Sequence, residues 1–153
     1  MPCPADIKIR PMNAADLDAV LAIEHNSFKT PWKREHFEAE LSGLHSFPLV
    51  ALHGTDVVGY VCLMSLFEEA QILDIAVRMD QRGRNVGLLL MEHAETVARE
   101  KRAEILSLEV RSSSIPAISL YERCGFRKTG IRARYYDSCE DAVLMEKNLK
   151  ETP

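Results

Sequence analysis

The stretch that decides the fold runs from Leu106 to Phe126 and reads LSLEVRSSSIPAISLYERCGF. Its apolar start, within a predicted strand over 105–110, carries one embedded acid, Glu109. A short polar loop follows, and residues 115–123 then predict a helix that bears Tyr121 and ends at Gly125. An acid at the end of a strand and a phenol on the next helix can converge on one reaction centre.

A second informative stretch lies upstream, where an apolar strand over 71–77 leads into the loop Arg82-Gly83-Arg84-Asn85-Val86-Gly87-Leu88. The loop opens the clearest helix of the chain, over 86–101, whose apolar residues recur at helical spacing. Backbone N–H groups at the start of a helix attract anions such as a pyrophosphate, and two arginines here add positive charge. Taken alone, the loop is also compatible with a simple connection between a strand and a helix.

The remaining elements complete an alternating pattern. We expect strands at 7–10, 47–53, 57–67, 127–136 and 141–148, and helices at 14–27 and from Trp32 to 42, with Asn13 capping the first helix. The order β-α-α-β-β-β-α-β-α-β-β predicts an α/β (α+β) fold, a mixed central β-sheet of about seven strands with about four helices on both faces. A ligand is expected at the carboxyl ends of the central strands, where the chain order switches.

Composition sets the broad class of the protein. With 153 residues, 46% hydrophobic and 27% charged, the chain is expected to form one globular domain over 1–153. A net charge of −4 argues against a nucleic-acid partner. No apolar run is long enough for a membrane span, and the start lacks signal-peptide features, which favours a cytoplasmic protein. The four cysteines lack zinc-site spacing, so no metal is expected. We expect a monomer or a weak dimer.

Together the two stretches resemble the GNAT family of acetyl-CoA-dependent N-acetyltransferases, and within it the ribosomal-protein-alanine N-acetyltransferases. The resemblance covers about residues 7–148. The loop from Arg82 to Gly87 is similar to the family pattern Gln/Arg-x-x-Gly-x-Gly/Ala, with Asn85 in place of the first Gly. Asn is the residue other than Gly that best tolerates positive φ, so the turn is expected to persist.

The resemblance implies that acetyl-CoA is the cosubstrate. The main chain at the end of the 71–77 strand would hold the acetyl-pantetheine arm as an added strand, and one N–H would polarise the thioester carbonyl. Where the family has an Asn after the catalytic strand, this chain has Ser114, whose shorter side chain implies a weaker or water-bridged contact. The expected cofactor-binding residues are Ile75, Ala76, Val77, Arg82, Gly83, Arg84, Asn85, Val86, Gly87, Leu88 and Ser114.

The same resemblance makes Glu109, in Leu-Glu-Val-Arg, the general base and Tyr121, in Ser-Leu-Tyr-Glu, the general acid. Independently, a carboxylate between two apolar residues of an interior strand should be partly desolvated. It would act directly or through a water. The residues alone also allow Glu109 to face solvent or pair with Arg111, and Tyr121 to serve packing only. A free α-amino group has a pKa of about 7.7–8.0, so its proton is easier to remove than that of lysine, at about 10.4.

The amine substrate is expected between two further segments. Residues 28–32 resemble the first interhelix loop of the ribosomal-alanine subfamily, and Arg134-Tyr135-Tyr136 resembles its hairpin; in the family these segments wall a peptide groove. Packing of the aromatic rings within the hairpin is the alternative. Glu24, on an apolar helix face, needs a partner and is expected to face the groove and receive the cationic substrate end; a surface acid on a rotated face is the alternative. The expected substrate-binding residues are Glu24, Phe28, Trp32, Arg134, Tyr135 and Tyr136.

The favoured function is direct, ternary-complex transfer of an acetyl group to the N-terminal amine of a protein, an alanine of a ribosomal protein. One alternative is a GNAT enzyme acting on lysine or a small amine. Another is a non-catalytic acetyl-CoA-binding sensor module, which the departures at Asn85 and Ser114 support. The presence of both Glu109 and Tyr121 argues against the sensor.

Overall fold

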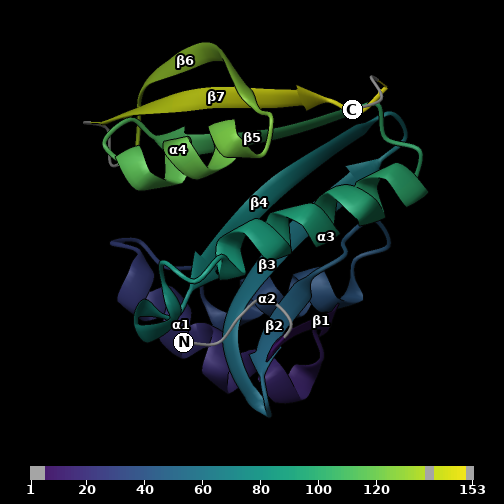
Figure 1. Ribbon diagram of the computed structural model, residues 1–153, viewed down its shortest axis with the longest axis vertical. Coiled ribbons are helices and arrows are strands. Elements are labelled where there is room, and N and C mark those ends of the chain that lie inside the picture. Colours follow the sequence, from purple (N-terminus) through teal and green to yellow (C-terminus); the bar gives the residue numbers. More distant parts are fainter. Residues whose placement is uncertain (1–5, 137–139, 151–153) are drawn as a thin grey trace.

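A seven-stranded sheet with helices on both faces forms the body of the protein (Figure 1). The computed structural model describes residues 6–136 and 140–150. Its elements are β1 (Ile7–Pro11), η2 (Ala14–Asp16), α1 (Leu17–Ser27), α2 (Arg34–Ser42), β2 (Leu49–His53), β3 (Asp56–Leu66), β4 (Glu69–Val77), η3 (Met79–Gln81), α3 (Val86–Glu100), β5 (Ile105–Arg111), α4 (Ile115–Arg123), β6 (Arg127–Tyr136) and β7 (Glu140–Asn148). The strand order β1-β2-β3-β4-β5-β7-β6 confirms the predicted mixed α/β sheet.

The helices divide the apolar interior into two cores. On one face, Leu90 and Ala94 of α3 and Ile118 of α4 pack with alternate residues of the central strands. On the other face, Val20 of α1 and Phe37 of α2 pack with side chains from β2, β3 and β4. The sheet is therefore covered on both sides, as the alternation of elements predicts.

Strands β4 and β5 are parallel neighbours that separate along their length. Within the described residues they pair only where Glu69–Gln71 lies beside Ile105–Ser107. Figure 1 shows the two strands adjacent near the C-terminal end of the chain and diverging away from it. Beyond Gln71, the main chain of β4 on the β5 side has no strand partner in the described part of the chain, so this edge is open to an extended ligand.

A β-bulge lies in β4 at the start of its open edge. Cys62 of β3 pairs with Asp74, whereas the next residue, Leu63, pairs with Ile72, so Leu73 is the extra residue. Bulges re-aim side chains and are frequent beside active sites. Here Ile72 belongs to the core under α3, while Tyr60 and Cys62, which pair with Ala76 and Asp74, belong to the core under α1.

The start of the first predicted helix differs from the structure for a local reason. The predicted helix over 14–27 begins with the 3₁₀ turn η2, and α1 starts at Leu17. Asn13 caps the turn as expected, since its side chain accepts from the Ala15 N–H at 3.0 Å. Asp16 completes a capping box and also binds Arg10 at 2.8 Å, which lowers the pKa of the Asp16 carboxyl.

Candidate active site

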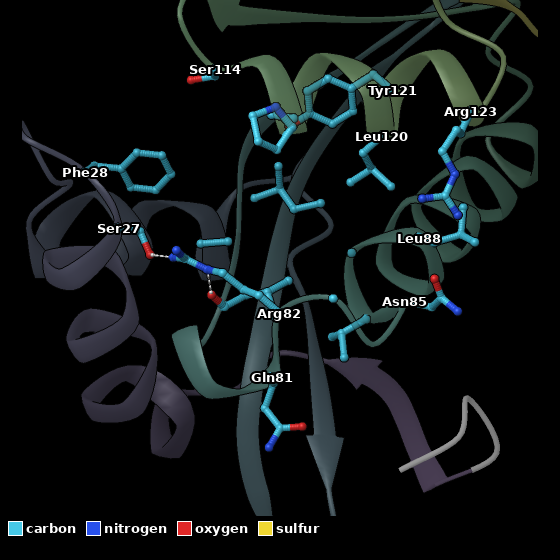
Figure 2. Close-up of a pocket in the computed structure, with 18 residues that line it drawn as sticks. Ser27, Phe28, Gln81, Arg82, Asn85, Leu88, Ser114, Leu120, Tyr121 and Arg123 are labelled. Atoms are coloured by element: carbon cyan, nitrogen blue, oxygen red, sulfur yellow. Dashed lines mark hydrogen bonds between the residues drawn. The ribbon is translucent and has the colours of Figure 1, made fainter. Parts of the chain in front are cut away.

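A cavity of about 520 Å³ lies between β4, the start of α3 and helix α4 (Figure 2). Its position at the carboxyl end of β4, beside the open edge, matches the prediction for a ligand at a switch in chain order. The lining residues are Ser27, Phe28, Ile75, Ala76, Val77, Gln81, Arg82, Gly83, Asn85, Val86, Gly87, Leu88, Ser114, Pro116, Ala117, Leu120, Tyr121 and Arg123.

The start of α3 gives the cavity an anion-binding end. Asn85 adopts a left-handed conformation with φ 65° and ψ 15°, which confirms that Asn can take the place of glycine in this turn. Gly83 has φ 77° in the same turn. Asn85 caps α3 with its backbone, and within the described residues its side chain makes no capping hydrogen bond. The first N–H groups of α3 are therefore available to an anionic ligand.

Two arginines border this end of the cavity. Arg82 donates from Nε to the Val77 carbonyl at 2.9 Å and from Nη2 to Ser27 Oγ at 3.2 Å, so it links the loop to both β4 and α1 (Figure 2). Arg123 approaches from α4, on the side of Asn85 and Leu88, and the sequence reasoning missed it. Arg84 lies outside the lining although its residue type and place in the loop suggested a contact.

Helix α4 supplies the opposite wall. Tyr121 is 7% exposed, and its ring packs near Phe126 with 6.2 Å between centroids. Ser114 lies at the start of the helix and lines the cavity, as expected. Ala117 and Leu120 line it too. Ala117 lies four residues before Tyr121 and three before Leu120, so helical spacing could have identified both residues. The helix ends at the predicted glycine, since Gly125 has φ 95°.

Glu109 lies outside the lining of the cavity, on the part of β5 beyond its pairing with β4, and it faces the other side of the sheet. Its neighbours Leu108 and Val110 are buried in the α3–α4 core, so its own side chain points to the α1 side, with 19% of it exposed. It forms an ion pair with Arg132 of β6, with 3.0 Å between Oε1 and Nη2. Arg111, the pairing alternative suggested by the sequence, instead binds Glu140 at 3.2 Å. Hydrogen bonds from Ser113 and Arg111 lower the pKa of the Glu140 carboxyl.

The residues expected on the amine side divide between the cavity and the core. Phe28 lines the cavity and is 36% exposed. Trp32 packs on Phe37 of α2, with 5.1 Å between ring centroids, and lies outside the lining. Glu24 is 1% exposed and accepts hydrogen bonds from Tyr60 and from the Trp32 N–H, so the structure buries it beneath the loop, which differs from the expectation that it faces a groove.

The remaining residues expected to bind the substrate lie on β6, which pairs with β7 and forms one edge of the sheet. Arg134 has φ 53°, and its N–H donates to Asp141 at 2.9 Å. Tyr135 is 47% exposed, and the Arg132 guanidinium lies over its ring at 4.7 Å. The side chain of Tyr136 lies outside the described part of the structure. Arg132, which the sequence reasoning missed, thus connects the exposed ring of Tyr135 to the Glu109 carboxylate.

Two further observations concern metal sites and membrane-spanning helices. In the described residues, no group of three His, Cys, Asp or Glu side chains is arranged to hold a metal ion. None of the helices in that part of the chain combines the length and apolar character needed to cross a bilayer.

A family model described as the acetyltransferase (GNAT) family matches residues 17–126, which spans both walls of the cavity. The chain belongs to this family. It is 37% identical over 94% of its length to a Bacillus subtilis (strain 168) protein provisionally named a ribosomal protein bS18-alanine N-acetyltransferase, covering 96% of that protein. It is 31% identical to the Escherichia coli (strain K12) enzyme named bS18-alanine N-acetyltransferase, covering 90% of this chain and 94% of the other.

The fold comparison agrees with the sequence comparison. The crystal structure of the ribosomal-protein-S18-alanine N-acetyltransferase from Escherichia coli superposes with a TM-score of 0.87 at 28% identity, covering 96% of both chains. The chain is therefore a GNAT N-acetyltransferase by sequence and by fold. Acetyltransferases of this family take their acetyl group from acetyl-CoA.

The cavity residues suit acetyl-CoA. The available N–H groups of α3, with Arg82 and Arg123 beside them, match a pyrophosphate in charge and geometry. The edge of β4 that has no strand partner among the described residues lies next to the apolar side chains of Ile75, Val77 and Leu120. This arrangement suits a pantetheine arm, which combines amide groups with methylenes. Ser114 adds a hydroxyl group from the start of α4, and Ser27 adds one that accepts from Arg82.

Proposed function

We propose that this enzyme acetylates the N-terminal α-amino group of a protein, an alanine at the start of a ribosomal protein such as bS18. The observation that carries the proposal is the open edge between β4 and β5, which has Glu109 on one face of the sheet and Tyr121 on the other. The names of the relatives support the choice of substrate. Their similarity extends over nearly the whole chain.

Acetyl-CoA supplies an activated thioester, and the remaining work is binding and proton transfer by the protein. Ile75, Ala76 and Val77 would hold the acyl arm along β4, with a main-chain N–H directed at the carbonyl. Residues 82–88 and Ser114 would also contact acetyl-CoA. Direct transfer between the two substrates in a ternary complex needs no covalent enzyme intermediate, and the described cavity offers no nucleophile–base pair that would form one.

Glu109 would accept the proton of the incoming ammonium group, directly or through a water. The carboxylate is held by Arg132, whose side chain is 53% exposed and therefore free to shift. An incoming ammonium group carries the same charge as Arg132, so it would displace that guanidinium in order to contact the carboxylate. Tyr121, on the opposite face, would donate its phenolic proton to the departing sulfur.

An α-amino group suits this arrangement better than lysine does. Its pKa is about two units below that of a lysine side chain, so a carboxylate removes its proton against a smaller gradient. Phe28, with Arg134 and Tyr135 of the hairpin, would contact the first residues of the peptide. The family resemblance assigns the same role to Tyr136. Trp32 would act by supporting the loop from Phe28 to Trp32, because its ring packs on Phe37.

The proposal is tested by acetyl-CoA turnover, measured as thiol release, against short peptides that begin with Ala, Ser, Met or Gly. An N-blocked peptide containing lysine and a set of free polyamines complete the panel. We expect turnover on free Ala and Ser N-termini, with mass spectrometry placing the acetyl group on the α-amine. Turnover on lysine or polyamines alone would discard the N-terminal substrate. Binding of acetyl-CoA without turnover on any amine would favour the sensor.

Adding a side chain at Gly87, which is packed closely against Leu120 of the opposite wall, should weaken acetyl-CoA binding selectively. A Cβ at this position would lie 3.1 Å from Leu120 Cδ2 and 3.8 Å from Val77 Cγ2, across the cavity. We expect Gly87→Leu to raise KM for acetyl-CoA roughly tenfold or more, about 1.4 kcal/mol, with a smaller change in KM for the peptide. Gly130→Ala, in β6 with an ordinary 3.4 Å contact, is the control glycine variant. An unchanged KM for acetyl-CoA in Gly87→Leu would place the cofactor elsewhere.

A further inference from the structure

Three side chains under the β4 bulge form a cluster that the proposed chemistry leaves unused: the buried Glu24 of α1 and Tyr60 of β3, and the half-buried Asp74 of β4. Glu24 is 1% exposed and Tyr60 is 0% exposed. The Tyr60 hydroxyl donates to Glu24 Oε1, and the Trp32 N–H donates to Glu24 Oε2 at 2.9 Å. Burial raises the pKa of Tyr60, which keeps its phenol protonated as the donor.

Asp74 completes the cluster as an acid. It pairs with Cys62 across β3 and β4, and its carboxyl is within hydrogen-bond reach of Glu24. Its Oδ2 is buried and receives no hydrogen bond from the described residues. Two carboxylates in this position would repel each other, whereas a protonated Asp74 donates to Glu24 and removes both problems. Burial and the contact with Glu24 raise the pKa of Asp74 from 3.8 to about 9.

The titratable groups around Asp74 favour its protonated form, whichever neighbouring element they come from. The titratable groups near it are Glu24 from α1, Tyr60 and Cys62 from β3 and, beyond Cys62, Glu40 from α2. All of these are neutral or negative at neutral pH. Burial also raises the pKa values of the Cys62 thiol and the Glu40 carboxyl.

Glu24 fixes the loop that carries Phe28 at two points. Its main-chain carbonyl accepts from the Phe28 N–H at 3.2 Å, and its carboxylate accepts from the Trp32 N–H. Phe28 lines the cavity, and Asp74 directly precedes Ile75, which lines the cavity from β4. The cluster therefore joins the loop proposed for the peptide side to the strand proposed for the acyl side.

We propose that Glu24, Tyr60 and Asp74 are positioning residues that hold the loop from Phe28 to Trp32 in a fixed place relative to β4, and that this arrangement requires a proton on Asp74. The proposal rests on the proposed function, because that function assigns the peptide to this loop. It gives Glu24 a supporting role in place of direct contact with the substrate.

The positioning role is tested by a matched pair of variants at Asp74. Asp74→Leu removes the donor to Glu24, and we expect kcat/KM for the peptide to fall by on the order of tenfold or more, while KM for acetyl-CoA stays within about twofold. Asp74→Asn restores a donor of the same shape and should recover kcat/KM. If Asp74→Leu does not fold, Glu24→Gln replaces it, since Tyr60 and Trp32 donate to different oxygens of Glu24 and glutamine keeps only one of the two. Equal losses of kcat/KM in Asp74→Leu and Asp74→Asn would overturn the positioning role. So would effects of equal size on the peptide and on acetyl-CoA.

The proton is tested without any substrate, by thermal unfolding of the wild type and Asp74→Asn from pH 5 to 10. A carboxyl whose pKa is raised in the folded state contributes stability that is present below its unfolded pKa and lost as pH rises through the folded value, here about 9. We expect the Tm of the wild type to fall relative to that of Asp74→Asn as pH rises toward 9, and the difference to level off above it. A constant difference would show that Asp74 is ionised and overturn the proposal. This result is independent of which amine the enzyme acetylates.

Discussion

Replacing Glu109 by glutamine is expected to lower kcat on a peptide that begins with alanine by a factor on the order of 10²–10⁴. Glutamine has nearly the same shape and keeps a hydrogen-bonding oxygen, but it cannot accept a proton from the ammonium group. Because the proton must leave before the amine can attack, the loss should appear in kcat more than in either KM. Thiol release under saturating acetyl-CoA, with the peptide varied, measures both parameters.

The ion pair between Glu109 and Arg132 supplies a control for this variant. Glu109→Gln removes the base and also breaks a contact between β5 and β6, so a loss could arise from either change. Arg132→Gln breaks the same contact and keeps the carboxylate. We expect its kcat to remain within about tenfold of the wild type, because an exposed ion pair contributes only about 0–1 kcal/mol to stability. Equal losses in the two variants, or normal turnover in Glu109→Gln, would remove Glu109 from the role of base.

The local features of this enzyme are predictable from its sequence because they depend on neighbouring residues. Alternating apolar residues identify the strands, and helical spacing identifies α3, since both patterns follow from which side of an element is buried. The turn at Asn85 is predictable because the left-handed conformation favours few residue types, and Asn is one of them. Tyr121 and its helix follow from the glycine that ends α4 and from the family motif.

The features that depend on distant contacts are harder to predict. The separation of β4 from β5 has no sequence pattern of its own, since each strand simply continues beyond their shared pairs, β4 to Val77 beside β3 and β5 to Arg111 beside β7. Arg132 reaches Glu109 from another strand, and neither residue type nor spacing indicates the pair. Glu24 illustrates the limit most clearly. An acid on an apolar helix face signals a partner, but the sequence does not say that the partner is a buried tyrosine and a second carboxyl.

Replacing Tyr121 by phenylalanine is the second variant with a large expected effect. The phenol lies on α4, where the ring is 7% exposed and packs near Phe126, so phenylalanine keeps the packing and removes only the hydroxyl. We expect kcat to fall by on the order of 10²–10⁴ with little change in either KM, since the departing sulfur loses its proton donor. Thermal unfolding of the variant verifies that the fold is intact.

The pH dependence of this loss separates proton donation from a positioning effect of the hydroxyl. A thiol has a pKa of about 8.5, so below that pH the departing sulfur gains from a proton, and above it the thiolate is itself a stable product. If Tyr121 is the donor, the ratio of wild-type to variant kcat should be largest near pH 7 and shrink as pH rises toward 9.5. A ratio that stays constant over this range would mean that the hydroxyl orients a substrate, and normal turnover at pH 7 would mean that the ring serves packing alone. Glu109→Gln tests the base in the same way, and its loss should also shrink as pH rises past about 8, because an α-amino group with a pKa of about 7.7–8.0 is almost fully neutral at pH 9.5 and no longer needs a base to remove its proton.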